Sequence, residues 1–168
     1  KHGYSSILIH EVLHIFGLIN TTTESDNYDI VNFIQGKPPY NSRKPQNIYY
    51  GEQGVAGYKQ VLIENGVSVD NLDDFIPIED DFSGGTKYFH FEEGINTLDH
   101  KDSNYYDNRM INGVNYPAVV NEIMTGFLDG NNYITPMTLG CLEDIGFTVN
   151  YESSYVVTTG KFLDIQTV

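Results

Sequence analysis

The residues best suited to chemistry are His10, Glu11 and His14, which form an H-E-x-x-H pattern close to the start of the chain. In an α-helix, residues four apart lie one turn apart on the same face, so both imidazoles point the same way. Two imidazoles placed like this can bind one Zn²⁺ ion, and the glutamate beside them can accept a proton. The pattern therefore predicts a catalytic zinc site, with His10 and His14 as metal ligands and Glu11 as the catalytic base.

The sequence around this pattern favours the helix that the geometry requires. Ser5 or Ser6 can cap the start of a helix, and Gly17 stands where a helix commonly ends. The residues between them include an apolar, helix-forming set: Ile7, Leu8, Val12, Leu13, Ile15 and Phe16. We therefore expect an active-site helix within residues 1–17. The alternative is a buried helix that carries two core histidines and a glutamate without a metal.

Composition limits the class of protein. The chain has 168 residues, enough for one domain with a real core, and 9 Lys and Arg against 23 Asp and Glu give a formal charge of −14. Because there is no basic run, nucleic acid and anionic membranes are poor partners for this surface. No apolar stretch approaches the roughly 20 residues that span a bilayer, so we expect no transmembrane segment. Cys141 is the only cysteine, which rules out an internal disulfide.

Two further helices are expected in the single domain formed by residues 1–168. An apolar stripe predicts one helix over residues 51–66, which Asn65-Gly66 closes. Segment 121–168 contains the other, a closing helix followed by a tail. This helix begins at Thr135-Pro136, where a capping hydroxyl precedes a proline at the first helical position.

The segments between the helices are predicted to be irregular. Residues 18–50 are polar and rich in Asn, Tyr and Pro, which is typical of a long surface loop. Residues 67–120 include a polar stretch at 94–116 that resembles an insertion in a loop. Three helices, long irregular connections and few strands together predict an α+β fold.

A catalytic zinc ion needs a third protein ligand and one open position. In metzincin peptidases the pattern extends to H-E-x-x-H-x-x-G-x-x-H, but Asn20 stands at the last place here and is a poor zinc ligand. The remaining histidines are His2, His90 and His100. The carboxylate of Glu122 is a further candidate for the third ligand.

Further pieces of sequence follow the first helix in a characteristic order. They are Tyr50-Gly51-Glu52, Ala56-Gly57-Tyr58, Ile76-Pro77-Ile78-Glu79, Gly84-Gly85-Thr86, His90-Phe91-Glu92-Glu93, Asn121-Glu122-Ile123-Met124-Thr125-Gly126, Thr135-Pro136-Met137-Thr138-Leu139 and Leu142-Glu143-Asp144-Ile145-Gly146-Phe147. In order and spacing the whole chain resembles the leishmanolysin-like zinc metallopeptidases, a metzincin branch that supplies its third histidine from far downstream. Two features depart from the family: residues 94–116 are longer than usual, and the family's cysteines are absent.

The resemblance implies that His90 is the third zinc ligand, in a segment over residues 67–120. It implies that segment 121–168 opens with a Met-turn, in which Met124 packs beneath the metal without binding it. The implied fold is a metzincin-like α+β fold that consists of the active-site helix and the C-terminal lobe with long irregular loops. The implied activity is that of a zinc-dependent metalloendopeptidase acting on protein or peptide substrates, in an extracellular or surface-associated setting.

Metzincins bind substrate along a sheet lobe that precedes the active-site helix. Because His10 lies so near Lys1, we expect that lobe to be missing and an upstream segment or a second chain to complete it. Residues 1–168 alone are then expected to be a poor peptidase. The alternatives are one half of a two-chain peptidase, or a catalytically silent structural or binding module that retains the fold. Glu11 argues against the catalytically silent module, because a purely structural zinc site does not need this carboxylate.

Other polar groups have simpler interpretations. The acidic stretches Asp70–Asp81 and Asp99–Asp107 offer oxygen ligands for Ca²⁺, but neither has a recognisable ligand spacing, and a solvated surface is the simpler interpretation. His90 itself has the alternative of an ordinary half-buried histidine.

Overall fold

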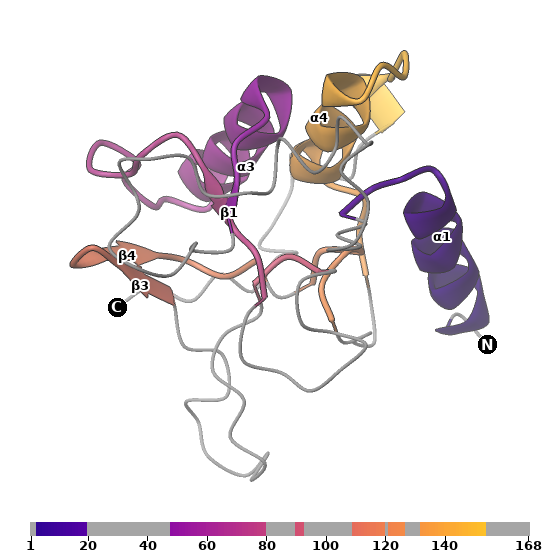
Figure 1. The fold of residues 1–168 in the computed structure, drawn as a ribbon, viewed down its shortest axis with the longest axis horizontal. Coiled ribbons are helices and arrows are strands. Elements are labelled where there is room, and N and C mark those ends of the chain that lie inside the picture. The colour runs from indigo at the N-terminus through magenta and orange to yellow at the C-terminus, as the bar shows by residue number, and fades with distance from the viewer. Residues whose placement is uncertain are drawn as a thin grey trace, which may run out of the picture.

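The computed structural model describes residues 3–19, 48–79, 90–92, 109–119, 121–126 and 132–153. Three α-helices lie in this part of the chain: α1 (Gly3–Ile15), α3 (Glu52–Glu64) and α4 (Pro136–Asp144), followed by a 3₁₀-helix at Tyr151–Ser153. Two small antiparallel sheets accompany them, pairing β1 (Ile48–Tyr49) with β2 (Ile76–Pro77) and β3 (Arg109–Ile111) with β4 (Val114–Tyr116). This mixture of helices and short strands agrees with the predicted α+β class (Figure 1).

α1 ends where its glycine predicts. Gly17 has φ 95°, in the left-handed region that glycine adopts without strain, and its N–H donates to the carbonyl of His14 at 2.9 Å. The N–H of Leu18 then donates to the carbonyl of Leu13 at 3.1 Å. The chain therefore turns sharply after the helix and buries Leu18 and Ile19.

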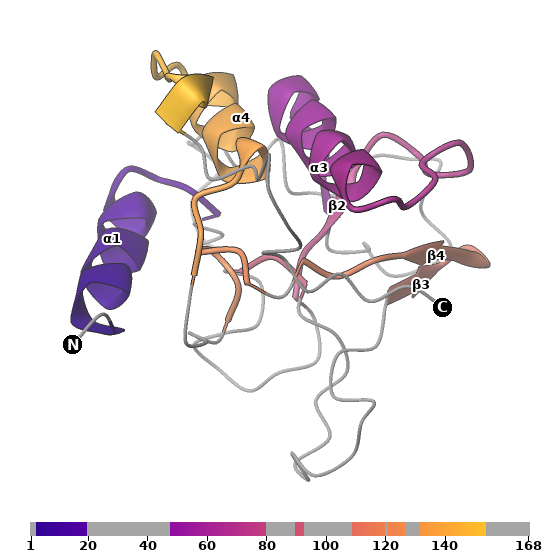
Figure 2. The same cartoon turned by 180° about the vertical axis from the view of Figure 1, so that it is seen from behind.

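One face of α1 is apolar and exposed. Tyr4, Leu8 and Ile15 are 85%, 65% and 79% exposed, whereas Leu13 on the inner side is buried. Both views place α1 at one side of the molecule, apart from the pair formed by α3 and α4 (Figures 1 and 2). None of the described helices has both the length and the apolar character needed to cross a membrane.

α3 and α4 pack against each other through glycines. A Cβ atom added at Gly57 would lie 2.2 Å from the carbonyl oxygen of Pro136, and one added at Gly140 would lie 2.1 Å from the carbonyl oxygen of Gln53. Each helix thus presents a glycine to the backbone of the other. The two backbones approach more closely than any larger residue at these positions would permit.

The start of α3 is held by a carboxylate from the end of α4. Gly51 precedes α3 and supplies no side-chain cap. Instead, Asp144 accepts the N–H groups of Gln53 and Gly54, each at 2.9 Å, and the hydroxyl of Tyr49 at 2.8 Å. A negative charge at this end of a helix pairs with N–H groups that have no partner within the helix.

Two expectations for the irregular segments are corrected. Residues 109–116, at the end of the predicted polar insertion, form the β3–β4 hairpin, which turns at Asn112-Gly113 with φ 52° and 81°. Both values are positive, as the tight turn of a two-residue hairpin requires. β1 lies inside the predicted loop over 18–50, and its side chains are buried because it pairs with β2. The rest of that loop, from residue 20 to 47, and residues 93–108 lie outside the described part.

The described core lies where α3, α4 and the short strands meet. Its largest buried side chains include Tyr49, Tyr58, Phe75, Phe91, Tyr116, Leu62, Ile76 and Ile78. The rings of Phe75 and Tyr116 stack with centroids 4.4 Å apart, so the β3–β4 hairpin is joined to the chain that precedes β2. Phe91, which follows the predicted metal ligand His90, is thus part of the core.

We predict that Gly140→Ala lowers the free energy of unfolding by about 2 kcal/mol, because its methyl group meets backbone rather than a flexible side chain. The control is Ala56→Gly on the exposed side of α3, which we expect to cost at most about 1 kcal/mol through helix propensity. Urea unfolding followed by circular dichroism measures both. A Gly140→Ala variant as stable as the wild type would contradict the close helix contact.

Candidate metal centre

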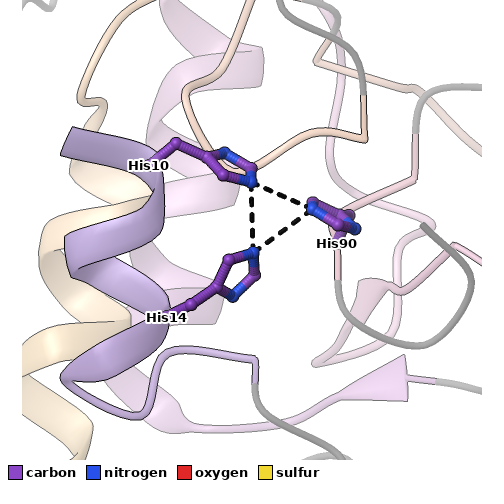
Figure 3. Close-up of side chains that lie close together, drawn as sticks. All are labelled: His10, His14 and His90. Atoms are coloured by element: carbon purple, nitrogen blue, oxygen red, sulfur yellow. Dashed lines mark hydrogen bonds between the residues drawn. The ribbon is translucent and has the colours of Figure 1, made fainter. Parts of the chain in front are cut away.

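Three histidines from distant parts of the chain meet at one point. The Nε2 atoms of His10 and His90 are 3.0 Å apart, those of His10 and His14 3.1 Å, and those of His14 and His90 3.3 Å (Figure 3). We call His10, His14 and His90 the three-histidine group. In the described part of the chain it is the one cluster of three or more His, Cys, Asp or Glu side chains arranged to hold a metal ion.

Hydrogen bonds fix which nitrogen of two histidines carries the proton. Nδ1 of His10 lies 2.6 Å from the carbonyl oxygen of Ile123, and Nδ1 of His14 lies 3.2 Å from the carbonyl oxygen of Leu18. A carbonyl oxygen can only accept, so each Nδ1 must donate its N–H. In the neutral imidazoles, Nε2 then carries a lone pair that points into the group.

Lone pairs of His10 and His14 that converge in this way could bind a cation. When both rings are neutral, neither His10 nor His14 has a proton to place between the two Nε2 atoms, which lie 3.1 Å apart. Such an arrangement is repulsive unless a positive ion lies between the nitrogens. Nδ1–H bonds to backbone carbonyls are also the usual outer contacts of histidines that bind metals. The three-histidine group could therefore hold a metal ion.

The protonation state of His14 suits a metal ligand. Burial, together with the neighbouring charge of His10, lowers its pKa below the ordinary 6.5, and the hydrogen bond to Leu18 and the charge of Glu11 oppose this change only partly. His14 is therefore neutral at neutral pH, and neutral imidazole is the form that binds metal.

A turn over residues 121–126 positions two of the three histidines. The carbonyl of Glu122 accepts the N–H of Thr125 at 3.3 Å, which closes the turn. The carbonyl of Ile123 accepts from His10, and the carbonyl of Met124 accepts the N–H of Phe91 at 2.9 Å. Successive carbonyls of the turn thus hold the helix with His10 and the segment with His90.

The segment that carries His90 is bonded on both sides. The carbonyl of His90 accepts the N–H of Glu79 at 2.9 Å, and Phe91 forms bridges to Ile78 and to Thr125. Phe91 itself is buried in the core. His90 is 6% exposed and His10 is 7% exposed, so backbone bonds and burial together fix where these rings lie.

Glu11 lies next to the three-histidine group and outside it. It follows His10 on α1 and its side chain is exposed. Residues 4, 8, 11 and 15 are spaced by four and three, so Glu11 shares the outer face of α1 with Tyr4, Leu8 and Ile15. A carboxylate in this position can reach water.

Of the other candidate ligands only Glu122 lies in the described residues, and it is not in the group. Glu122 is fully buried elsewhere: its carboxylate accepts the N–H of Met124 and the hydroxyls of Thr135 and Thr138. Its interpretation as the third ligand is therefore wrong, because its oxygens are engaged between the turn and α4. His2 and His100 lie outside the described residues, as does position 20.

Two further expectations concern this region. Met124 is buried in the 121–126 turn, in the place predicted for the Met-turn. The described part of the first acidic stretch, residues 70–79, forms no group of side chains that could hold a metal, and Asp99–Asp107 lies outside the described residues.

Sequence reasoning missed the groups that hold the ligands. The contacts of Ile123, Met124 and Leu18 are made by backbone carbonyls, which every residue possesses, so no residue type marks them. The contacts of Glu122 to Thr135 and Thr138 depend on the packing of α4 beside the turn, which residue spacing does not reveal.

Comparisons with protein-family models, with curated proteins and with solved structures find no match to this chain.

We predict that His90→Ala abolishes tight metal binding, because it leaves two ligands of the three. The measurement is metal content after dialysis against zinc and removal of excess metal, with His100→Ala as the matched control. Wild type and the His100 variant are expected to retain about one ion per chain. If the His100 change strips the metal and the His90 change does not, the ligand assignment is wrong.

A further prediction concerns the pH dependence of stability that Glu122 confers. Burial raises the pKa of its carboxyl from 4.5 to about 7, even though hydrogen bonds from Thr138, Met124 and Thr135 oppose this change. A pKa that is higher in the folded than in the unfolded chain stabilises the fold at low pH, and this stabilisation is lost as the pH rises from about 4.5 through 7.

Glu122→Gln does not titrate, so its stability relative to wild type should increase between pH 4.5 and 7.5, by an amount of the order of 3 kcal/mol. Urea unfolding of both metal-free proteins across this range gives the difference and cancels the contribution of every other group. A difference that stays constant with pH would refute the raised pKa.

Proposed function

We propose that this chain is the zinc-binding catalytic part of a metalloendopeptidase with a metzincin-like fold, of the leishmanolysin-like type. The observation that carries the proposal is the convergence of three imidazole nitrogens beside the exposed carboxylate of Glu11. The order of the sequence pieces around these residues supports the same assignment.

The spacing of the nitrogens fits zinc. Zinc binds imidazole nitrogen at about 2.0–2.1 Å, and tetrahedral geometry then separates two such nitrogens by about 3.3 Å. The three observed separations are 3.0, 3.1 and 3.3 Å. The three nitrogens could therefore hold one zinc ion. Three protein ligands leave the fourth position open, which is typical of catalytic rather than structural zinc sites.

Each residue of the site has a distinct role in the proposed reaction. His10, His14 and His90 hold the ion, which when bound acts as a Lewis acid that activates water and polarises the peptide carbonyl. Glu11 accepts a proton from the attacking water on its carboxylate and then donates it to the amine that leaves. The carbonyls of Ile123 and Leu18 keep His10 and His14 in the orientation that presents Nε2.

The exposed face of α1 favours a form of this function in which another surface completes the substrate site. Glu11 lies among Tyr4, Leu8 and Ile15, which are largely exposed. An open apolar face neither excludes water nor aligns a peptide, and exposed apolar patches commonly mark interaction sites. An upstream segment or a second chain that covers this face would complete the substrate site.

We predict that Glu11→Gln removes peptidase activity while zinc stays bound. The amide is nearly isosteric with the carboxylate and cannot accept the proton, so we expect a loss of about 10²–10⁴-fold in turnover. The assay is cleavage of an unstructured protein in the presence of zinc, with a chelator-treated sample for comparison.

Glu52→Gln, in the first turn of α3, is the matched control and should cleave at the wild-type rate. Cleavage by the Glu11 variant at that same rate would eliminate Glu11 as the base. Wild-type protein that binds zinc and cleaves nothing, even with the longest available chain, would instead favour the silent structural or binding module.

A further inference from the structure

We propose that Glu122 is a positioning residue of the metal centre, which fixes the 121–126 turn on α4 and through it orients His10 and His90. The inference rests on the proposed function, because it assumes that the three-histidine group binds zinc. It concerns a residue that lies outside the group and is not needed to account for the chemistry.

His10 and His90 both depend on the 121–126 turn. The carbonyl of Ile123 is the acceptor of the short 2.6 Å bond from Nδ1 of His10. The next carbonyl, that of Met124, accepts the N–H of Phe91, and this bond sets the position of the neighbouring His90. A shift of the turn would therefore misorient the ring of His10 and move His90 relative to His14, whose own partner Leu18 lies just after α1.

The 121–126 turn is attached to the segment that follows it and to the start of α4. The backbone of the turn is bonded to the following segment, since Ile123 donates to the carbonyl of Tyr133 at 2.8 Å. The side chain of Glu122 adds a bond within the turn, to the N–H of Met124, and bonds to Thr135 and Thr138 at the start of α4. This one carboxylate thus joins the carbonyl-bearing turn to a helix of the core.

The carboxylate of Glu122 is surrounded by buried hydrogen-bond donors. Glu122 is 0% exposed, as are Thr135 and Thr138, so no water can replace a lost bond. Every group around the carboxylate is a donor, and two backbone N–H groups cannot reverse that role. An amide at this position has one acceptor oxygen in place of two, so part of the network must open and the turn must shift.

The test compares Glu122→Gln with Asp144→Asn. Both changes convert a carboxylate that accepts backbone N–H groups into an amide, but Asp144 holds the start of α3 and not the turn. Zinc affinity is measured at pH 8 by competition with a chromophoric chelator. We expect affinity to fall about 10–100-fold in the Glu122 variant, as for other outer contacts of metal ligands, and less than about 3-fold in the Asp144 variant.

Two spectroscopic readouts separate positioning from a general loss of stability. In cobalt-loaded protein, the visible absorption bands report the geometry around the metal, and we expect them to change in the Glu122 variant alone. In zinc-loaded protein, the Nδ1–H proton resonance of His10 reports its bond to Ile123 and should move upfield in the same variant. Both readouts should be unchanged in the Asp144 variant, even if the two variants unfold at the same temperature.

Wild-type affinity and spectra in the Glu122 variant would overturn the inference, and equal losses in both variants would do the same. If Glu122→Gln does not fold, Thr138→Val replaces it, because it removes one donor to the carboxylate without changing its volume, with Thr138→Ser as the conservative control. The inference then requires weaker zinc binding in the valine variant and wild-type binding in the serine variant. Failure of the wild type itself to bind zinc or cobalt would instead refute the proposed function.

Discussion

The hydrogen bond between Nδ1 of His10 and the carbonyl of Ile123 is the interaction on which the rest of the site depends. α1 carries two of the three histidines, yet it stands apart from α3 and α4 in both views (Figures 1 and 2). The bond spans 113 positions in the sequence and is 2.6 Å long. It fixes the proton of His10, the rotation of its ring and the position of the helix relative to the turn. The other contacts of the 121–126 turn matter to the site because this bond joins the turn to α1.

The part of the site that depends on local spacing was predictable from sequence. His10, Glu11 and His14 are related by helical geometry alone, and apolar residues before Gly17 predict a helix here. The predicted serine cap is wrong, because α1 begins at Gly3 and both Ser5 and Ser6 lie inside it. His90 has no such relation to the first helix, so residue spacing left three histidines and Glu122 as candidates. Only the resemblance selected it. The structure places it in the group through backbone bonds of Phe91 and Glu79, which leave no mark in the sequence.

The fold shows the same division. α3 and α4 were predicted because an apolar stripe and the Thr135-Pro136 start are local signals, and Thr135 does accept the N–H of Met137 at 3.2 Å. β1 was missed because two residues are too few to show periodicity. The hairpin at residues 109–116 was missed for a different reason. Its Asn112-Gly113 turn is a strong local signal, but the polar composition around it favoured a loop.

The long stretch of chain between His10 and His90 means that an ion held by both residues would affect the free energy of unfolding. His10 and His90 are 80 positions apart, so an ion shared between them would close a loop as long as those closed by large disulfides. In the chain-entropy view, a cross-link of this span removes about 4–5 kcal/mol of freedom from the unfolded chain. With one cysteine, the protein has no covalent means to do this within itself. A bound ion would thus act as a reversible cross-link, and its removal would lower the resistance of the chain to unfolding and to proteolysis.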